Sequence, residues 1–283
     1  MTQLKVGAID AGGGTRSIFG AGVLDKCMDL NINFDHFVGV SAGSANGASY
    51  LAGQRGRNLV FFNDYAFRKE YMSVEHFIKT GSYLNFDYIF GTLSNEDGEY
   101  PLDYDKMMAN KCGFEIVATN AVTGRPIYFN KKEIERNKYE FFKASCCVPV
   151  ICKPYYIGKI PCYDGGLADP IPYKRVFRAG CDKVVVILTK PRDTVRNPRK
   201  DRMIAATFSS EYPNAAEALA ERAYTYNKSM QEVFELEKEG KALIIAPENI
   251  GDLKTLSQDH EALLDLYEQG LRAAEAIPAF MEA

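Results

Sequence analysis

Residues 34–53 read FDHFVGVSAGSANGASYLAG, and this stretch determines the fold of the chain. The apolar run 34–40 predicts a short buried strand, and the small-residue run 42–53 predicts the helix that follows it. Between them lies Gly39-Val40-Ser41-Ala42-Gly43, a G-x-S-x-G pentapeptide. In this setting the serine occupies a strained strand-to-helix turn, where flanking glycines leave room and the hydroxyl is exposed. Ser41 is therefore a candidate nucleophile that still needs a base.

Strands and helices alternate outward from this stretch. We expect further strands over 4–10, 114–119, 127–129, 150–157, 183–189 and 242–246, and helices over 18–30, 139–146, 172–179, 214–239 and 257–277. Such alternation predicts an α/β fold, a three-layer sandwich with a mostly parallel central sheet covered on both faces. Neither an internal repeat nor a low-complexity linker interrupts the pattern, so we expect a single domain over residues 1–283.

An aromatic-rich segment at about 58–108 departs from the alternation. Its periodicity is poor, and it contains ten of the phenylalanines and tyrosines between Phe61 and Phe90. One interpretation is a packed helical insertion. The other is an apolar cover over an active site that helps to admit an acyl chain, because ligand pockets are lined mainly by such side chains. Both interpretations can hold at once.

Composition excludes several classes of protein. The 283 residues are 46% hydrophobic and 25% charged, with a formal net charge of -3, so nucleic acid is not an expected partner. No apolar run approaches the roughly 18 residues that a membrane span needs, and we expect no signal peptide. Seven cysteines without paired C-x-x-C spacing predict reduced thiols in a cytoplasmic protein, with neither metal nor cofactor.

A glycine cluster, Gly12-Gly13-Gly14-Thr15-Arg16-Ser17, lies between the first strand and the first helix. A phosphate-binding loop would need a lysine that is absent here, and Ser17 replaces the third glycine of a dinucleotide-binding pattern. Consecutive glycines can instead direct backbone N–H groups into one concavity, as an oxyanion hole requires. Because the nucleophile turn follows on the next strand, we favour the oxyanion hole.

The base that activates Ser41 has few candidates. The chain contains three histidines, His36, His76 and His260, and only His260 lies late enough in the sequence for the usual Ser-acid-His order. The alternative is Asp164 in Tyr163-Asp164-Gly165-Gly166, where two glycines let the chain turn sharply after a strand or hairpin. A D-G-G sequence alone is usually just a turn, so its weight comes from the other two motifs.

Taken together, the loop 12–16, the pentapeptide 39–43 and the later D-G-G at 164–166 resemble the patatin-like phospholipases, with the segment ASCCVP at 144–149 adding to the likeness. The DPIP sequence at 169–172 and the last helix resemble bacterial members. The resemblance implies a Ser-Asp dyad that works without histidine. It makes Ser41 the nucleophile and Asp164 the general base. Ser17 stands where most members have glycine.

The same resemblance assigns the glycine loop. It implies an oxyanion hole formed by Gly12, Gly13 and Gly14, of which Gly13 and Gly14 match best, with Arg16 as electrostatic support. The expected activity is hydrolysis of lipid carboxylic esters through an acyl-enzyme, of phospholipase A or lysophospholipase type, with transient contact to a membrane surface. Two alternatives stay open: an α/β-hydrolase-type esterase or thioesterase with a Ser-Asp-His triad, and a catalytically silent protein of the same fold.

Overall fold

A computed structural model describes residues 4–283 and shows one eight-stranded sheet at its centre, in the order β5-β6-β3-β2-β1-β7-β8, with β4 paired to β3. Strands β3, β2, β1, β7 and β8 are parallel, whereas β4 and β6 pair antiparallel to β3, and β5 to β6. The strands are β1 (Val6–Asp10), β2 (His36–Val40), β3 (Gly113–Asn120), β4 (Pro126–Asn130), β5 (Tyr155–Ile157), β6 (Ile160–Asp164), β7 (Lys183–Ile187) and β8 (Ala242–Ile245).

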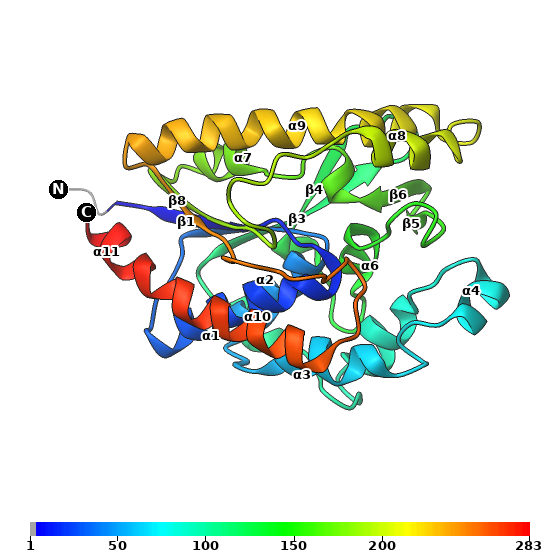
Figure 1. Ribbon diagram of the computed structural model, residues 1–283. Coiled ribbons are helices and arrows are strands. Elements are labelled where there is room, and N and C mark those ends of the chain that lie inside the picture. The colour runs from blue at the N-terminus through cyan, green and yellow to red at the C-terminus, as the bar shows by residue number, and fades with distance from the viewer. Residues whose placement is uncertain (1–3) are drawn as a thin grey trace.

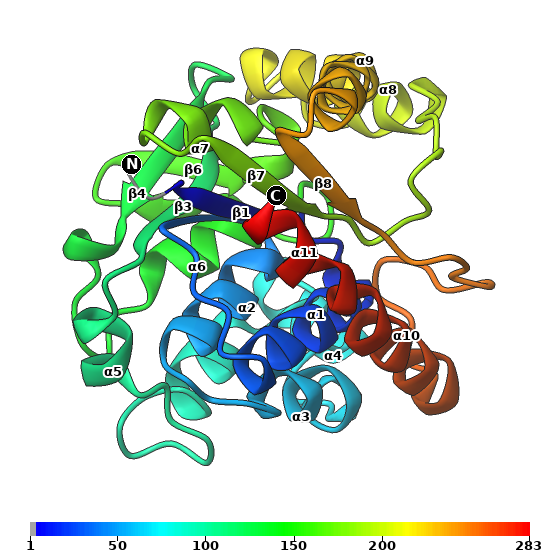
Figure 2. The same ribbon diagram turned by 90° about the vertical axis from the view of Figure 1, so that its left-hand side faces the viewer.

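Helices cover both faces of the sheet (Figures 1 and 2), which confirms the predicted three-layer α/β class. The upper layer in Figure 1 consists of α7 (Tyr173–Arg178), α8 (Arg199–Ala206) and α9 (Pro213–Lys238). The lower layer includes α1 (Ile18–Asp29), α2 (Ala42–Leu51), α3 (Arg57–Asn63), α6 (Glu140–Ser145) and α10 (His260–Ala273), and α11 (Ile277–Glu282) follows α10.

The core divides into two apolar clusters, one on each face of the sheet. In β1, Ala8 packs into the cluster shared with α1 and α10, while the next residue, Ile9, packs into the cluster shared with α9. Successive side chains of a strand point to opposite faces, and both faces are covered here, so β1, β2 and β7 are almost wholly apolar. The two layers therefore fix the carboxyl ends of these strands at one edge of the molecule.

One expectation about local structure was wrong, and one helix was not expected. We expected one strand over 150–157, but regular pairing begins only at Tyr155. Val150 has φ 70°, and the Cys152 N–H donates to the Val148 carbonyl at 2.8 Å. A turn therefore occupies this apolar run, because a strand cannot pass through a positive φ. The sequence pattern also missed α8, which is short and mainly polar.

The aromatic-rich segment folds into short helices beneath the sheet. It contains α3, α4 (Val74–Thr80) and α5 (Tyr104–Ala109), joined by single turns, and Figure 1 shows α4 projecting from the lower layer. The segment is therefore helical and largely packed against the core, although α4 itself buries no residue.

Within residues 4–283, no helix combines the length and the apolar character that crossing a bilayer would require. All seven cysteines are free thiols.

Candidate active site

Ser41 lies at the junction of β2 and α2, with φ 54° and ψ -135°. A positive φ is strained for a residue with a side chain and persists only where neighbouring contacts impose it. Two contacts do so here: the Ser41 N–H donates to Ser145 Oγ at 2.8 Å, and the Ser44 N–H donates to the Ser41 carbonyl at 2.9 Å. Ser145 Oγ in turn donates to the Val117 carbonyl in β3 at 2.6 Å. The turn is thus fixed to the centre of the sheet.

The two glycines of the pentapeptide allow this close packing. A Cβ on Gly39 would come within 2.4 Å of the Ser44 Cα, and a Cβ on Gly43 would come within 2.4 Å of the Asp10 carbonyl oxygen. Gly39 and Gly43 therefore serve the geometry of the turn, whereas Ser41 is the residue of the pentapeptide whose side chain can react.

The glycine loop follows β1 and is held from three sides. The Gly12 N–H donates to Asp10 Oδ1 at 2.9 Å, and the Gly12 carbonyl accepts from the Thr189 hydroxyl at 2.6 Å. On the far side the Thr15 N–H donates to the Thr255 carbonyl at 2.8 Å. Since the Gly12 N–H is committed to Asp10, the donors in this loop that can face an oxyanion are Gly13 and Gly14.

Asp10 is a fully buried carboxyl at the base of this loop. Burial raises its pKa to about 6, against hydrogen bonds from the Asn46 side chain and the Gly12 N–H, which lower it. Asn46 Nδ2 also donates to the Ser17 carbonyl at 2.8 Å, so one amide ties β1 to the end of the loop. Ser17 is itself fully buried, so the loop accommodates a side chain at this position.

Asp164 reaches Ser41 because β2 and β6 both pair with β3. Val40 is in register with Val117, and Asp164 is in register with Ala118, the next residue of β3. Burial raises the pKa of Asp164, while hydrogen bonds from Ser41 and from the Gly166 N–H oppose the shift. The Gly166 N–H lies 2.8 Å from Asp164 Oδ1. A buried carboxyl in the same cavity as a serine hydroxyl, with its pKa raised, is a candidate proton acceptor.

A cavity of about 430 Å³ opens over these groups. Its lining includes every site residue expected from the sequence except Gly39 and Gly43, namely Ser41, Asp164, Gly12, Gly13, Gly14 and Arg16. One end is apolar and is lined by the aromatic-rich segment, with Phe61, Phe62, Tyr71, Met72, Phe86 and Phe90. The other end is lined by cationic side chains from the connection after β7 and from α8 and α9: Lys190, Arg196, Lys200 and Arg222.

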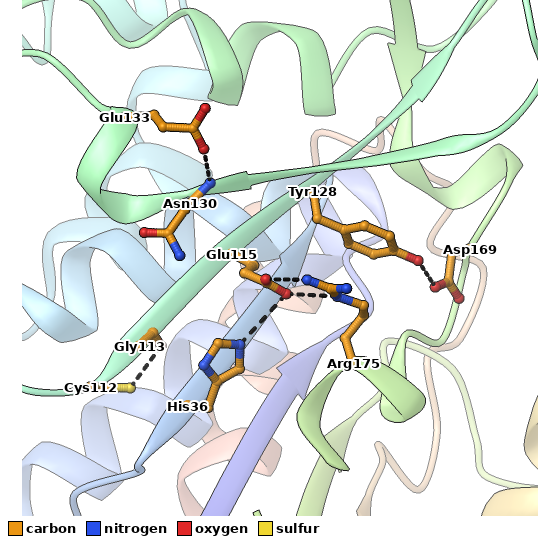
Figure 3. A network of polar contacts seen from close by, with 9 residues as sticks. All are labelled: His36, Cys112, Gly113, Glu115, Tyr128, Asn130, Glu133, Asp169 and Arg175. Carbon is orange, nitrogen blue, oxygen red and sulfur yellow. Dashed lines mark hydrogen bonds and ion pairs between the residues drawn. The ribbon is translucent and has the colours of Figure 1, made fainter. Parts of the chain in front are cut away.

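None of the three histidines is among the residues that line this cavity. His36 faces Glu115 instead, with His36 Nε2 3.6 Å from Glu115 Oε2, in a network that Figure 3 shows. Burial acts to raise the Glu115 pKa, but His36 and Arg175 together lower it to about 2. His260 stacks on the Phe67 ring at 3.6 Å. No histidine is therefore in place to complete a triad with Ser41.

Several residues that build the site were missed from the sequence. Asp10, Ser145 and Thr189 hold the loop and the turn, and Lys190 and Arg196 line the cavity. Asp10 and Thr189 did carry a signal, because each is a polar residue at the carboxyl end of a buried parallel strand. In open α/β sheets, ligands bind outside these ends.

Two family models match the chain. The model described as patatin-like phospholipase matches residues 11–177, and a second, described as a domain of unknown function (DUF6363), matches residues 212–281. The uncharacterized protein YjjU of Escherichia coli (strain K12) is 28% identical over 200 residues, which cover 69% of this chain. The match covers 55% of YjjU, so the chain spans about half the length of that curated relative.

Among solved structures, the crystal structure of VipD from Legionella pneumophila has a similar fold. Its TM-score is 0.50 at 12% sequence identity, and the superposition covers 99% of this chain and 67% of VipD. At this identity the likeness concerns the fold alone. The first family model, by contrast, covers more than half of the chain, including the glycine loop, the pentapeptide and the D-G-G segment. The chain belongs to the patatin-like phospholipase family.

Proposed function

We propose that this protein is a serine acyl hydrolase that cleaves lipid carboxylic esters through a Ser41-Asp164 dyad. Family membership supports lipid acyl hydrolase activity in general. The observation that carries the finer assignment is that the two motifs meet. Ser41 and the buried Asp164, at the end of β6, line one cavity that no histidine lines, and the Ser41 side chain acts to lower the Asp164 pKa.

The proposed reaction uses the groups around Ser41 in sequence. Asp164 takes the hydroxyl proton while Oγ attacks the ester carbonyl, and the N–H groups of Gly13 and Gly14 hold the resulting oxyanion. Collapse of this tetrahedral intermediate releases the alcohol, which takes the proton from Asp164, and an acyl-enzyme remains. Water then repeats the same steps: Asp164 accepts its proton, and Ser41 is regenerated as the free acid departs.

The apolar end of the cavity supports a fatty-acyl substrate. The rings of Phe86 and Phe90 lie 6.4 Å apart between centroids, and Phe90 stacks on Phe142 at 5.8 Å, so this wall is continuous with the core. Near it, α4 exposes Val74 and Ile78, which supports transient contact with a lipid surface. The seven free thiols support a reducing, cytoplasmic location.

Hydrolysis of a p-nitrophenyl fatty-acyl ester tests the dyad. Ser41→Ala and Asp164→Asn are each expected to lower kcat at least a thousandfold, because each removes a group that reacts in the bond-making step. Mass spectrometry should detect an acyl group on Ser41 in the wild type. His260→Ala is the matched control and should retain activity. A folded His260→Ala variant without activity would replace the dyad with a triad, and absent labelling of Ser41 by a fluorophosphonate would indicate a silent protein.

The pH profile gives a separate test of Asp164 as base. The base must be deprotonated, and burial raises its pKa, so kcat/KM should fall as pH decreases through a value above that of an ordinary aspartate. The profile is measured as kcat/KM between pH 4 and 9. A value of kcat/KM that stays constant down to pH 4 would contradict the assignment.

A further inference from the structure

We propose that Lys190 and Arg196 form an anion-binding subsite at the cationic end of the Ser41 cavity, which binds a phosphate-type group on the alcohol side of the ester. The inference rests on the proposed function, because it assigns the leaving group of the same reaction. The acyl chain then occupies the aromatic end, and Ser41 lies between the two ends. The lining includes residues of α3 and of α8 and α9, and Figure 1 shows α3 below the sheet and α8 and α9 above it.

The cationic end carries positive charge that the protein does not neutralise. Asp164 and Asp201 are the carboxylates of the lining, and Asp201 is bound by Arg222, with Nε 2.9 Å from Oδ2. Among the ion pairs formed by residues 4–283, none includes Arg16, Lys190 or Arg196. Arg16 is buried, and Lys190 and Arg196 are half-buried. Cations removed from water are usually paired, so an unpaired group of them inside a cavity indicates a missing anion.

Hydrogen bonding gives a second, independent sign. The Nε atoms of Arg16 and Arg196 are buried, and neither has a hydrogen-bond partner within the described part of the chain. Arg57, at the other end of the cavity, differs in this respect: its guanidinium donates to Ser49, Ser94 and the Tyr100 carbonyl. Arg57 is therefore satisfied by the fold, whereas Arg16 and Arg196 keep donors available for a ligand.

The position of Arg196 is fixed before any ligand binds. Its N–H donates to Asn227 Oδ1 and its carbonyl accepts from Asn227 Nδ2, both at 2.9 Å, so one side chain of α9 holds the backbone from both sides. The guanidinium carbon lies 4.1 Å from the centre of the Tyr226 ring. A guanidinium held in this way loses little freedom on binding, which favours planar recognition of a phosphate.

Lys190 is affected by the same surroundings. Burial lowers its pKa to about 8, and the positive charges of Arg196, Arg16 and Arg222 act in the same direction. A bound anion would offset this repulsion and favour the protonated amine.

The alternative role of Arg196 is to act only on the base, by lowering the pKa of Asp164. Its charge, like that of Arg222, lowers the pKa of Asp164, against the larger effect of burial. Such a role would alter the hydrolysis of every ester by the same factor. A subsite for the leaving group would alter the preference between esters. The two roles are therefore separated by a ratio of rates.

The test compares two esters with the same acyl chain, 1-oleoylglycerol 3-phosphate and 1-oleoylglycerol, in mixed detergent micelles. For the wild type, kcat/KM should be higher for the phosphate ester, and added salt should reduce that preference. Lys190→Gln and Arg196→Gln should each lower the ratio of the two kcat/KM values about tenfold or more. Arg196→Lys should restore part of it. Arg199→Gln, an exposed cation three residues away that does not line the cavity, should leave the ratio unchanged.

Binding of soluble anions to the Ser41→Ala protein, measured by calorimetry, gives a readout that does not need turnover. Glycerol 3-phosphate should bind, and Arg196→Gln should abolish the signal. If neither ester is hydrolysed but glycerol 3-phosphate binds, the proposed function fails and the anion site stands. An unchanged ratio in both glutamine variants overturns the subsite. The subsite is also overturned if kcat/KM falls by the same factor for both esters and the acidic side of the pH profile shifts. Inorganic phosphate binding without a change in the ratio identifies a free anion and overturns the assignment to the leaving group.

Discussion

The floor of the cavity and its aromatic wall are built on different principles. The floor, formed by the glycine loop and the turn at Ser41, is positioned by backbone contacts that leave little room for change: Ser41 is held at φ 54°, and Gly14 lies against Thr255. The wall, formed by residues 57–94, is positioned mainly by packing of apolar side chains, and its helix α4 buries no residue. Backbone-defined sites fail abruptly when altered, whereas apolar packing adjusts to similar volumes.

Among variants that keep both dyad residues, the largest effect is expected from Gly14→Ala, at the most crowded point of the floor. Gly14 has φ 64°, and a Cβ there would come within 1.9 Å of the Thr255 carbonyl oxygen. The loop must move, which displaces the N–H groups that would hold the oxyanion. We expect kcat to fall at least a hundredfold, measured on the same p-nitrophenyl ester.

Gly53→Ala is the matched control for this variant. Gly53 has nearly the same φ, 65°, but nothing lies within 4 Å of the position of its Cβ. It should lose only about 1 kcal/mol in the free energy of unfolding and keep its kcat. Full activity in Gly14→Ala would remove the distinction between floor and wall.

An intermediate effect is expected from Ser145→Ala, which removes one support of the floor and leaves the reacting groups in place. The part-buried Ser41 N–H loses its acceptor, so the free energy of unfolding should fall by about 1–3 kcal/mol. Relaxation of the strained turn should lower kcat about tenfold, with KM little changed. Denaturant unfolding and steady-state kinetics measure the two quantities.

Ser49→Ala provides the comparison for Ser145→Ala. Ser49 is also a buried serine with two side-chain hydrogen bonds, to Asn58 and Arg57, but it does not contact the turn. It should lose similar stability without the loss in kcat. Equal kinetic losses in both variants would show that the support of Ser41 is not specific.

The smallest effect is expected in the wall, from Leu84→Ala. Leu84 lines the apolar end of the cavity, and its backbone pairs with that of Met72 in an isolated antiparallel β-bridge. The truncation should lower the preference for p-nitrophenyl dodecanoate over the butyrate by about tenfold at most, since each methylene of the acyl chain that is no longer buried costs about 0.8 kcal/mol. Ile78→Ala, exposed on α4, should leave the preference unchanged. If Leu84→Ala abolished hydrolysis of both esters, the wall would not tolerate a truncated side chain in the way that apolar packing should.

The sequence predicted those parts of the site whose residues are fixed by local backbone geometry. A serine between two glycines after an apolar run specifies its own turn, and three consecutive glycines specify a loop with positive φ values. The D-G-G sequence at Asp164 gained its weight from these two motifs, because on its own it usually marks only a turn. In the loop and in the pentapeptide, the expected role and the conformation that supports it lie within a few residues.

The remaining parts depend on which strands are neighbours. Thr189 reaches Gly12 only because β7 pairs with β1, and Arg196 reaches the cavity only because α9 holds it through Asn227. Neither the order of strands nor the position of a distant helix is encoded in a local pattern. The error at residues 150–157 has a related cause, since an apolar run carries the same signal for a strand and for a buried turn.

The contact between the glycine loop and Thr255 bears on how this chain can be divided. The loop lies in the region matched by the patatin-like family model, and Thr255 lies in the region matched by the domain of unknown function. The two matched regions therefore meet beside the candidate oxyanion hole, and other contacts join them too, such as the bond from the Tyr267 hydroxyl to Asp25 Oδ2 at 2.7 Å. For this reason we propose that residues 1–283 form one domain. A hybrid that received residues 212–281 from another protein would keep every motif of the family, but its glycine loop would lose the contact with Thr255.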